Sequence, residues 1–111
     1  SATSNSLRGR TLDVLYIDEF VHVNDVLQRD IISGFMPIVM TCQTKVIIAT
    51  SAGYKSTWVY DCWHNDKSQF CKLLFDYKCH SYDTNWAKHI RTQLDDRSFR
   101  SEYLCEFIER M

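Results

Sequence analysis

The sequence predicts an α/β fold with a parallel sheet, and three observations support that prediction. Residues 12–19 begin with LDVLYI, an apolar run without alternation that is typical of a strand covered on both faces. Residues 24–33 have the periodicity of a helix, and residues 45–51 begin with a second apolar run, KVIIAT. Strand, helix and strand in this order form a βαβ unit. We therefore expect two parallel strands joined by a helix.

The helix predicted over 24–33 has both a start and a stop signal. Asn24 is a favourable N-cap, and the negative charge of Asp25 complements the helix dipole. Gly34 is a residue that commonly ends helices, and Pro37 lies shortly beyond it. These signals predict a helix of about three turns.

Residues 70–80 alternate between apolar and polar side chains, which predicts a half-buried strand. Only Leu74 interrupts the alternation. The side chains predicted to face the interior are Cys71, Leu73, Phe75, Tyr77 and Cys79.

Two helices are expected over 84–109, as a C-terminal pair. Asp83 would cap the first, whose apolar stripe contains Trp86, Ile90 and Leu94. The second would begin at Ser98, and its stripe follows from Phe99, Tyr103 and Phe107 at helical spacing.

Composition limits the class of protein. A chain of 111 residues is expected to form one small domain, 1–111, and an aromatic content of 14% excludes disorder of the whole chain. The formal net charge of −1 gives no argument for a nucleic-acid-binding surface. The chain shows neither a secretory signal pattern nor an apolar run of about 20 residues, so we expect an intracellular protein that is not secreted and not membrane-bound. Its five cysteines are expected to be reduced thiols.

An acidic pair at the end of the first strand is the sharpest functional signal. In VLYIDE, four apolar residues lead directly into Asp18 and Glu19. The carboxyl ends of parallel strands form the functional edge of such a sheet. One carboxylate can hold Mg²⁺ through water, and the other can polarise an attacking water, as in a Walker B strand. On the pair alone, a solvated turn after a strand explains the same residues.

The second predicted strand also ends in polar residues. It runs into Thr50 and Ser51, about thirty residues after the acidic pair. A hydroxyl-rich turn accounts for these two residues equally well when they are considered alone. Beside a Walker B strand, such hydroxyls are placed to sense the phosphates of a nucleotide.

Taken together, these segments resemble the large subunit of viral DNA-packaging terminases of tailed bacteriophages and herpesviruses. The matching segments, in chain order, are LRGR (7–10), DVLYIDEF (13–20), FMPIVM (35–40), KVIIATSAG (45–53) and FRSEYLCEF (99–107). The resemblance implies a P-loop NTPase fold of the RecA-like kind, with a parallel sheet and flanking helices. The last segment is similar to the point where the ATPase part of that family meets its nuclease.

The chain departs from that family at two points. Phe20 follows the acidic pair where the family usually has Ala, and no G-x-x-x-x-G-K-[ST] phosphate loop is present. We therefore expect a partial domain, the C-terminal half of the ATPase. We expect no ATP turnover from this chain alone.

The resemblance implies a role for each matching residue. Glu19 would be the catalytic carboxylate, Asp18 would support Mg²⁺ through water, and Thr50 and Ser51 would couple the nucleotide state to motion. Arg8, with Arg10 as the alternative, would reach the phosphates bound to a neighbouring subunit, although both would also suit a solvated loop. The complete enzyme would use Mg²⁺ and ATP to pump double-stranded DNA, with a portal protein, a small terminase subunit and a homo-oligomeric ring. It would act in the cytoplasm of an infected bacterium or, for a herpesvirus-like protein, in the host nucleus.

Other interpretations remain. Another nucleotide-driven, helicase-like motor would show the same strand ends, and a small non-catalytic interaction module would need neither. A zinc site involving Cys62, His64, Cys71, Cys79 or His80 is not predicted. Cys62-x-His64 is too closely spaced for a structural zinc pair, and the two cysteines of the predicted strand would face the interior.

Overall fold

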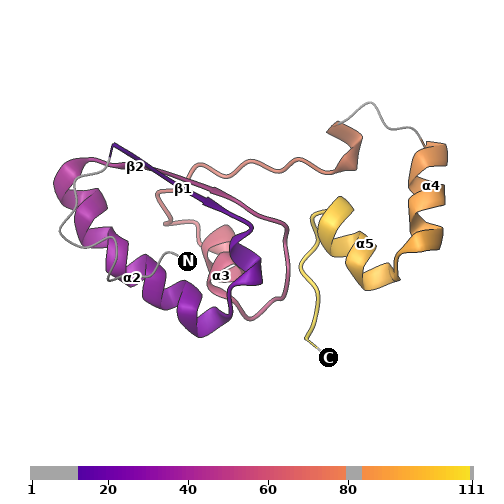
Figure 1. Ribbon diagram of the computed structural model, residues 1–111, viewed down its shortest axis with the longest axis horizontal. Coiled ribbons are helices and arrows are strands. Elements are labelled where there is room, and N and C mark those ends of the chain that lie inside the picture. The colour runs from indigo at the N-terminus through magenta and orange to yellow at the C-terminus, as the bar shows by residue number, and fades with distance from the viewer. Residues whose placement is uncertain (1–12, 80–83, 111) are drawn as a thin grey trace. The chain divides into compact units, whose positions relative to one another are not determined.

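The computed structural model describes residues 13–79 and 84–110, and it confirms an α/β fold with a two-stranded parallel sheet (Figure 1). The chain divides into two compact units, Ser1–Thr50 and Ser51–Met111. The segment 7–10, with Arg8 and Arg10, lies outside the described residues.

The first unit is the predicted βαβ unit. Strand β1 (Val14–Asp18) leads through a 3-10 turn, η1 (Phe20–His22), into helix α2 (Asp25–Cys42), and β2 (Lys45–Ala49) follows. The strands are parallel, with Val14 beside Lys45 and Asp18 beside Ala49. Both strands are shorter than the predicted ranges 12–19 and 45–51, and residue 12 is not among the described ones.

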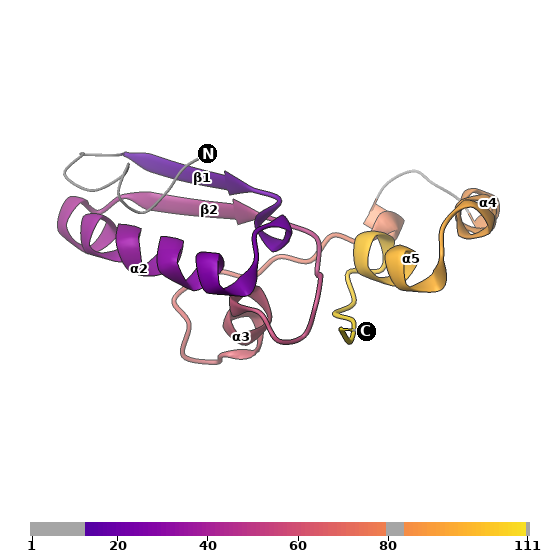
Figure 2. The same ribbon diagram turned by 60° about the horizontal axis from the view of Figure 1, so that its bottom comes forward.

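Helix α2 lies along both strands of this unit (Figure 2). Its buried side chains include Ile31, Phe35 and Ile38, and Phe20 of the 3-10 turn is fully buried with them. Removing these apolar surfaces from water is the main term that stabilises the unit. The core therefore lies between the helix and the sheet.

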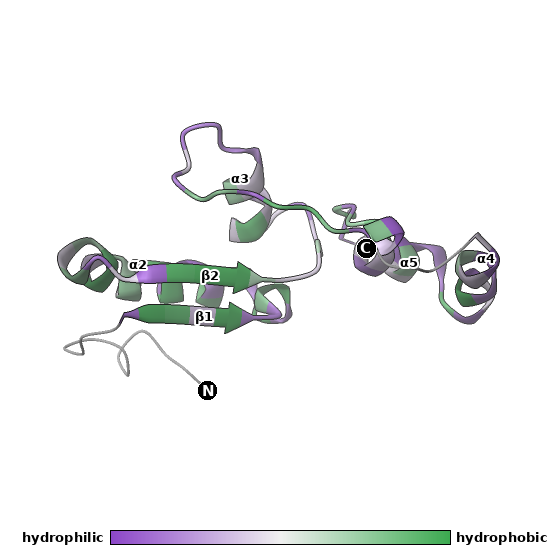
Figure 3. Ribbon diagram, turned by 90° about the horizontal axis from the view of Figure 1, so that it is seen from above, coloured by the Kyte–Doolittle hydropathy of each residue, from purple (hydrophilic) through white to green (hydrophobic). Residues whose placement is uncertain are grey.

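The sheet is covered less than the sequence predicted. Exposed and half-buried side chains alternate along each strand, and both strands are rich in apolar residues (Figure 3). Val14, Tyr16 and Ile47 have exposed fractions of 52, 57 and 52%. The prediction of strands covered on both faces is therefore wrong for the described residues. A continuous apolar run indicates that both faces of a strand are able to pack. Covering the second face also requires another layer of helices or strands, which the run itself does not predict.

Helix α2 is also longer than predicted. It continues through Gly34 and Pro37 and ends at Cys42, with Gln43 as a C-cap in the left-handed region at φ 54°. Gly34 is buried inside the helix. Burial of Phe35 and Ile38 outweighs the weak helix propensity around Gly34 and Pro37, because packing of an apolar face contributes more than propensity does.

In the second unit, two chain segments are joined by backbone hydrogen bonds. Lys55 donates its N–H to the carbonyl of Ile108 at 3.0 Å, and the N–H of Ile108 bonds to Gly53 at 2.9 Å. The hydroxyl of Ser101 accepts a bond from the Gly53 N–H at 3.0 Å. These bonds hold residues early and late in the unit side by side.

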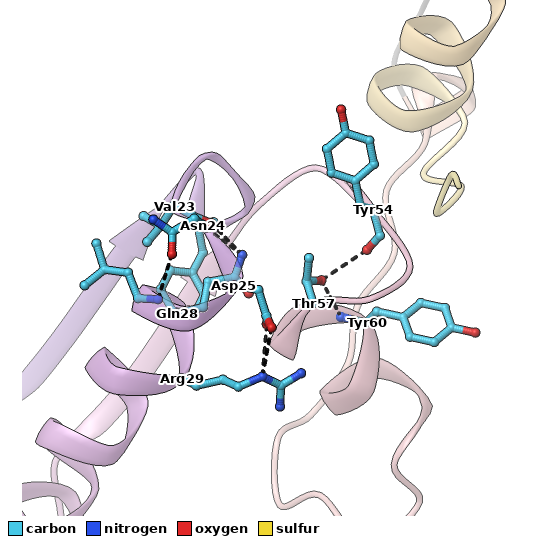
Figure 4. Close-up of polar contacts among 10 residues, drawn as sticks. Val23, Asn24, Asp25, Gln28, Arg29, Tyr54, Thr57 and Tyr60 are labelled. Carbon is cyan, nitrogen blue, oxygen red and sulfur yellow. Dashed lines mark hydrogen bonds and ion pairs between the residues drawn. The ribbon is translucent and has the colours of Figure 1, made fainter. Parts of the chain in front are cut away.

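Helix α3 (Trp58–His64) was not predicted. Its N-cap is Thr57, whose hydroxyl accepts a bond from the N–H of Tyr60 at 3.2 Å and donates to the carbonyl of Tyr54 at 3.1 Å (Figure 4). A threonine that does both stabilises the start of a helix only two turns long.

The strand predicted over 70–80 does not form. Residues 71–76 have no regular secondary structure, Tyr77–Cys79 is a 3-10 turn (η2), and residue 80 lies outside the described part. Leu73 and Phe75 are exposed at 68 and 66%, and Cys71 and Cys79 are also exposed instead of buried. Alternation makes a strand only where a neighbouring strand pairs with it, and no described segment does so here.

The C-terminal helical pair is present as α4 (Thr84–Gln93) and α5 (Asp96–Tyr103). Asp83, the predicted cap, lies outside the described residues. Helix α5 begins earlier than the predicted Ser98, because Asp95 accepts bonds from the Ser98 N–H at 2.8 Å and its hydroxyl at 3.0 Å. Helix α5 ends before Phe107.

No helix in 13–79 or 84–110 has the length and apolar character needed to cross a membrane.

Candidate functional site at the strand ends

The candidate site lies at the carboxyl ends of β1 and β2. Asp18 is the last residue of β1 and lies beside Ala49 at the end of β2. The N–H of Glu19 donates to the carbonyl of Ala49 at 2.7 Å, and Thr50 comes next in the chain. Three of the predicted site residues, Asp18, Glu19 and Thr50, therefore meet at one edge of the sheet.

Glu19 makes a sharp turn possible. Its backbone is in the left-handed region, at φ 54° and ψ 45°, which is uncommon for a residue with a side chain. The carbonyl of Glu19 accepts a bond from the N–H of His22 at 3.0 Å. We call residues 18–22 the acidic turn. Its conformation turns the chain away from the strand immediately after Asp18.

Two interactions fix the acidic turn from neighbouring elements. The hydroxyl of Thr50 accepts a bond from the N–H of Val21 at 3.0 Å. Phe20, which departs from the expected Ala, is fully buried and anchors the turn in the core. The bulky side chain therefore points away from the exposed carboxylates that precede it.

A buried amide supports the same turn from α2. The side chain of Gln28 has no exposed surface, and its Nε2 donates to the carbonyls of Phe20 at 3.3 Å and Val23 at 2.8 Å (Figure 4). The exposed Asp25–Arg29 pair on the same helix makes its closest contact at 3.0 Å. The buried amide of Gln28 is tolerated because its two hydrogen bonds satisfy it. Gln28 thus links the helix to the backbone that follows Glu19.

Each carboxylate of the acidic pair has a side-chain neighbour. Nε2 of His22 lies 2.8 Å from Oε2 of Glu19, and Tyr16 lies on the same strand face as Asp18. The pKa of the Tyr16 phenol is raised, first by partial desolvation and then by the charge and hydrogen bond of Asp18 and the charge of Glu19. A raised pKa favours the protonated form of the phenol.

Comparisons of the chain with protein-family models, with curated proteins and with solved structures found no significant match.

Two other predicted site residues belong to other parts of the chain. Ser51 is the first residue of the second unit, and Arg8 precedes the first described residue, as does its alternative Arg10. The sequence analysis missed Tyr16 and His22. Tyr16 is two positions before Asp18 and shares its strand face, and His22 is three positions after Glu19, at the spacing of a 3-10 turn.

The described residues contain no group of three or more His, Cys, Asp or Glu side chains placed to hold a metal ion. A Mg²⁺ ion does not require such a group, since it keeps several waters and is commonly bound by one or two carboxylates together with substrate phosphates. The exposed carboxylates of Asp18 and Glu19 fit that mode of binding. They can hold a hydrated cation and accept a proton from water.

Proposed function

We propose that this chain is part of the ATPase of a viral DNA-packaging motor, the large terminase subunit. The observation that carries the proposal is the meeting of Asp18, Glu19 and Thr50 at the carboxyl edge of a parallel sheet. That arrangement is the one a Walker B strand and its neighbouring strand require. The order of the matching sequence segments adds to it.

In this proposal the two carboxylates have different roles. Asp18 holds Mg²⁺ through a water molecule, and the cation neutralises charge on the phosphates of ATP. Glu19 orients and deprotonates the attacking water. Tyr16, on the same strand face as Asp18, would donate to this carboxylate and keep it in place.

Thr50 supplies the coupling step of the proposed motor. Its hydroxyl bonds to the backbone immediately after Glu19, so any displacement of the end of β2 changes the position of the acidic turn. Ser51, the next residue, would share this role, and Arg8 or Arg10 would act on a neighbouring subunit. The partners of such a motor are double-stranded DNA, a portal protein, a small subunit and other copies in a ring inside an infected cell.

The test compares the isolated chain with a motor subunit that contains it and a phosphate loop. The isolated chain should release phosphate from Mg²⁺-ATP at the rate of the buffer, because it has no phosphate loop. In the motor subunit, Glu19→Gln should bind ATP within a few-fold of wild type and lower turnover by about 10²-fold, the scale of a lost general base. Asp18→Asn should in addition weaken the dependence on Mg²⁺.

Asp30→Asn is the matched control, because Asp30 is an exposed acid on α2 that the proposal gives no role. It should leave turnover unchanged. Wild-type turnover in Glu19→Gln would refute the assignment and would favour a non-catalytic interaction module. A helicase-like motor would be favoured if single-stranded nucleic acid stimulates the ATPase activity and if double-stranded DNA with a portal protein does not.

A further inference from the structure

We infer that His22 is a positioning residue for the carboxylate of Glu19. The inference rests on the proposed function, in which Glu19 acts on water. Its structural basis is the contact of 2.8 Å between Nε2 of His22 and Oε2 of Glu19 across a single 3-10 turn.

The backbone brings these two side chains together. The left-handed conformation of Glu19 starts the turn, and the His22 N–H closes it on the carbonyl of Glu19 at 3.0 Å. Phe20 lies between the two residues in the sequence, and its full burial anchors the turn in the core. His22 is therefore held on the same side as the carboxylate that it contacts.

The contact between His22 and Glu19 is better suited to orienting the carboxylate than to stabilising the fold. The side chains of His22 and Glu19 are exposed at 69 and 54%. An exposed pair of this kind contributes little to folding. A glutamate side chain has three rotatable bonds, however, and one donor on Oε2 restricts where its carboxylate points. The pair is thus suited to directing the second oxygen.

The surroundings are consistent with a role in the site. The charges of Asp18 and Glu19 both act on the phenol of Tyr16 on β1, and the hydroxyl of Thr50 after β2 accepts a bond from the N–H of Val21. His22 is the side-chain donor that the described structure assigns to Glu19.

The first part of the test uses the chain itself and does not depend on ATP. NMR spectra should show that Glu19→Gln moves the imidazole resonances of His22, while those of His64 and His89 stay in place. His22→Phe keeps a ring and removes the donor, so it should move the Glu19 carboxylate resonance. His22→Gln, which keeps an N–H donor, should move it less. His89→Phe, the same change at an exposed residue of α4, should leave it unmoved.

The second part uses the motor subunit. His22→Phe should lower kcat by about tenfold, the effect expected of a misplaced group, with KM unchanged. His22→Gln should restore most of the loss. The positioning role is refuted if Glu19→Gln lowers turnover and His22→Phe does not. It is also refuted if the NMR resonances do not respond. In both cases the proposed function stands. If Glu19→Gln has no effect on turnover, the proposed function itself fails, whatever the spectra show.

Discussion

The hydroxyl of Thr50 and the backbone N–H of Val21, 29 positions apart in the chain, are joined by a hydrogen bond of 3.0 Å. The bond connects the end of one strand to the turn that follows the other. It gives the acidic turn a partner outside its own segment, in addition to the support that Gln28 provides from the helix.

Thr50→Val should destabilise the first unit, because it keeps the shape of the side chain and leaves the Val21 N–H without its acceptor. We expect a loss of about 1 kcal/mol in the free energy of unfolding. Urea denaturation followed by circular dichroism measures it. Thr50→Ser retains the hydroxyl and should lose much less, and a larger loss in Thr50→Ser than in Thr50→Val would show that the methyl group matters instead.

The backbone at Glu19 offers a second stability test. A left-handed residue carrying a Cβ is strained by roughly 1 kcal/mol relative to glycine. Glu19→Gly should therefore be more stable than Glu19→Ala by about that amount, since both variants lack the carboxylate and differ in the strain. Thermal melts of the two proteins make the comparison. Equal stability would argue against the left-handed conformation in solution.

Helix α5 should show a pH dependence that originates at its cap. The pKa of the Asp95 carboxyl is lowered, first by the backbone N–H of Ser98 and then by its hydroxyl. A folded pKa below the unfolded one means that the stabilisation is present at neutral pH. It is lost as the pH falls through the folded pKa, below about pH 4.

Asp95→Asn keeps an oxygen acceptor at the cap and removes the titrating group. Its melting temperature should fall less steeply in acid than that of the wild type, as circular dichroism at a series of pH values will show. Parallel curves for the two proteins would contradict a charged cap.

The five thiols should differ in reactivity in the folded protein. Cys71 is exposed, whereas the pKa of Cys105 is raised by burial and by the nearby Asp76 and Cys79. The Cys105 thiol also donates to the carbonyl of Phe75 at 3.3 Å. Because the thiolate is the reactive form, Cys71 should be alkylated faster than Cys105 at neutral pH.

Mass spectrometry after a short pulse of alkylating reagent locates the modified residues. In denaturant all five cysteines should react, and the difference between Cys71 and Cys105 should disappear. A preference that persists in denaturant would come from local sequence and not from the fold.

The sequence predicted the first unit well because its signals are local and agree with one another. Two apolar runs, a capped helix between them and polar residues at both strand ends specified the parallel pair and placed Asp18, Glu19 and Thr50 together. The length of α2 could not be predicted in this way. Whether a helix passes Gly34 and Pro37 depends on the tertiary burial of Phe35 and Ile38, which no local pattern contains.

The other differences between the predicted and the observed structure also arise from contacts that no local pattern contains. Alternation over 70–80 specifies a strand only if another strand pairs with it. The contact of His22 with Glu19 depends on the turn that starts at the left-handed Glu19. A residue such as Glu19 gives no sign in the sequence that it adopts positive φ, since glycine or asparagine is the usual occupant. The exposed Cys71 and Cys79 follow from the missing strand.

The course of α2 through Gly34 and Pro37 has a consequence for the order in which the unit opens and closes. Asn24 caps the first turns, and the Asp25–Arg29 pair supports them, so this half can form early. Beyond it, Pro37 has no N–H to donate to the carbonyl of Ser33, and the rest of the helix depends on its packing. Amide hydrogen exchange should therefore reveal two protection classes within one helix, and β2 should exchange together with the second half.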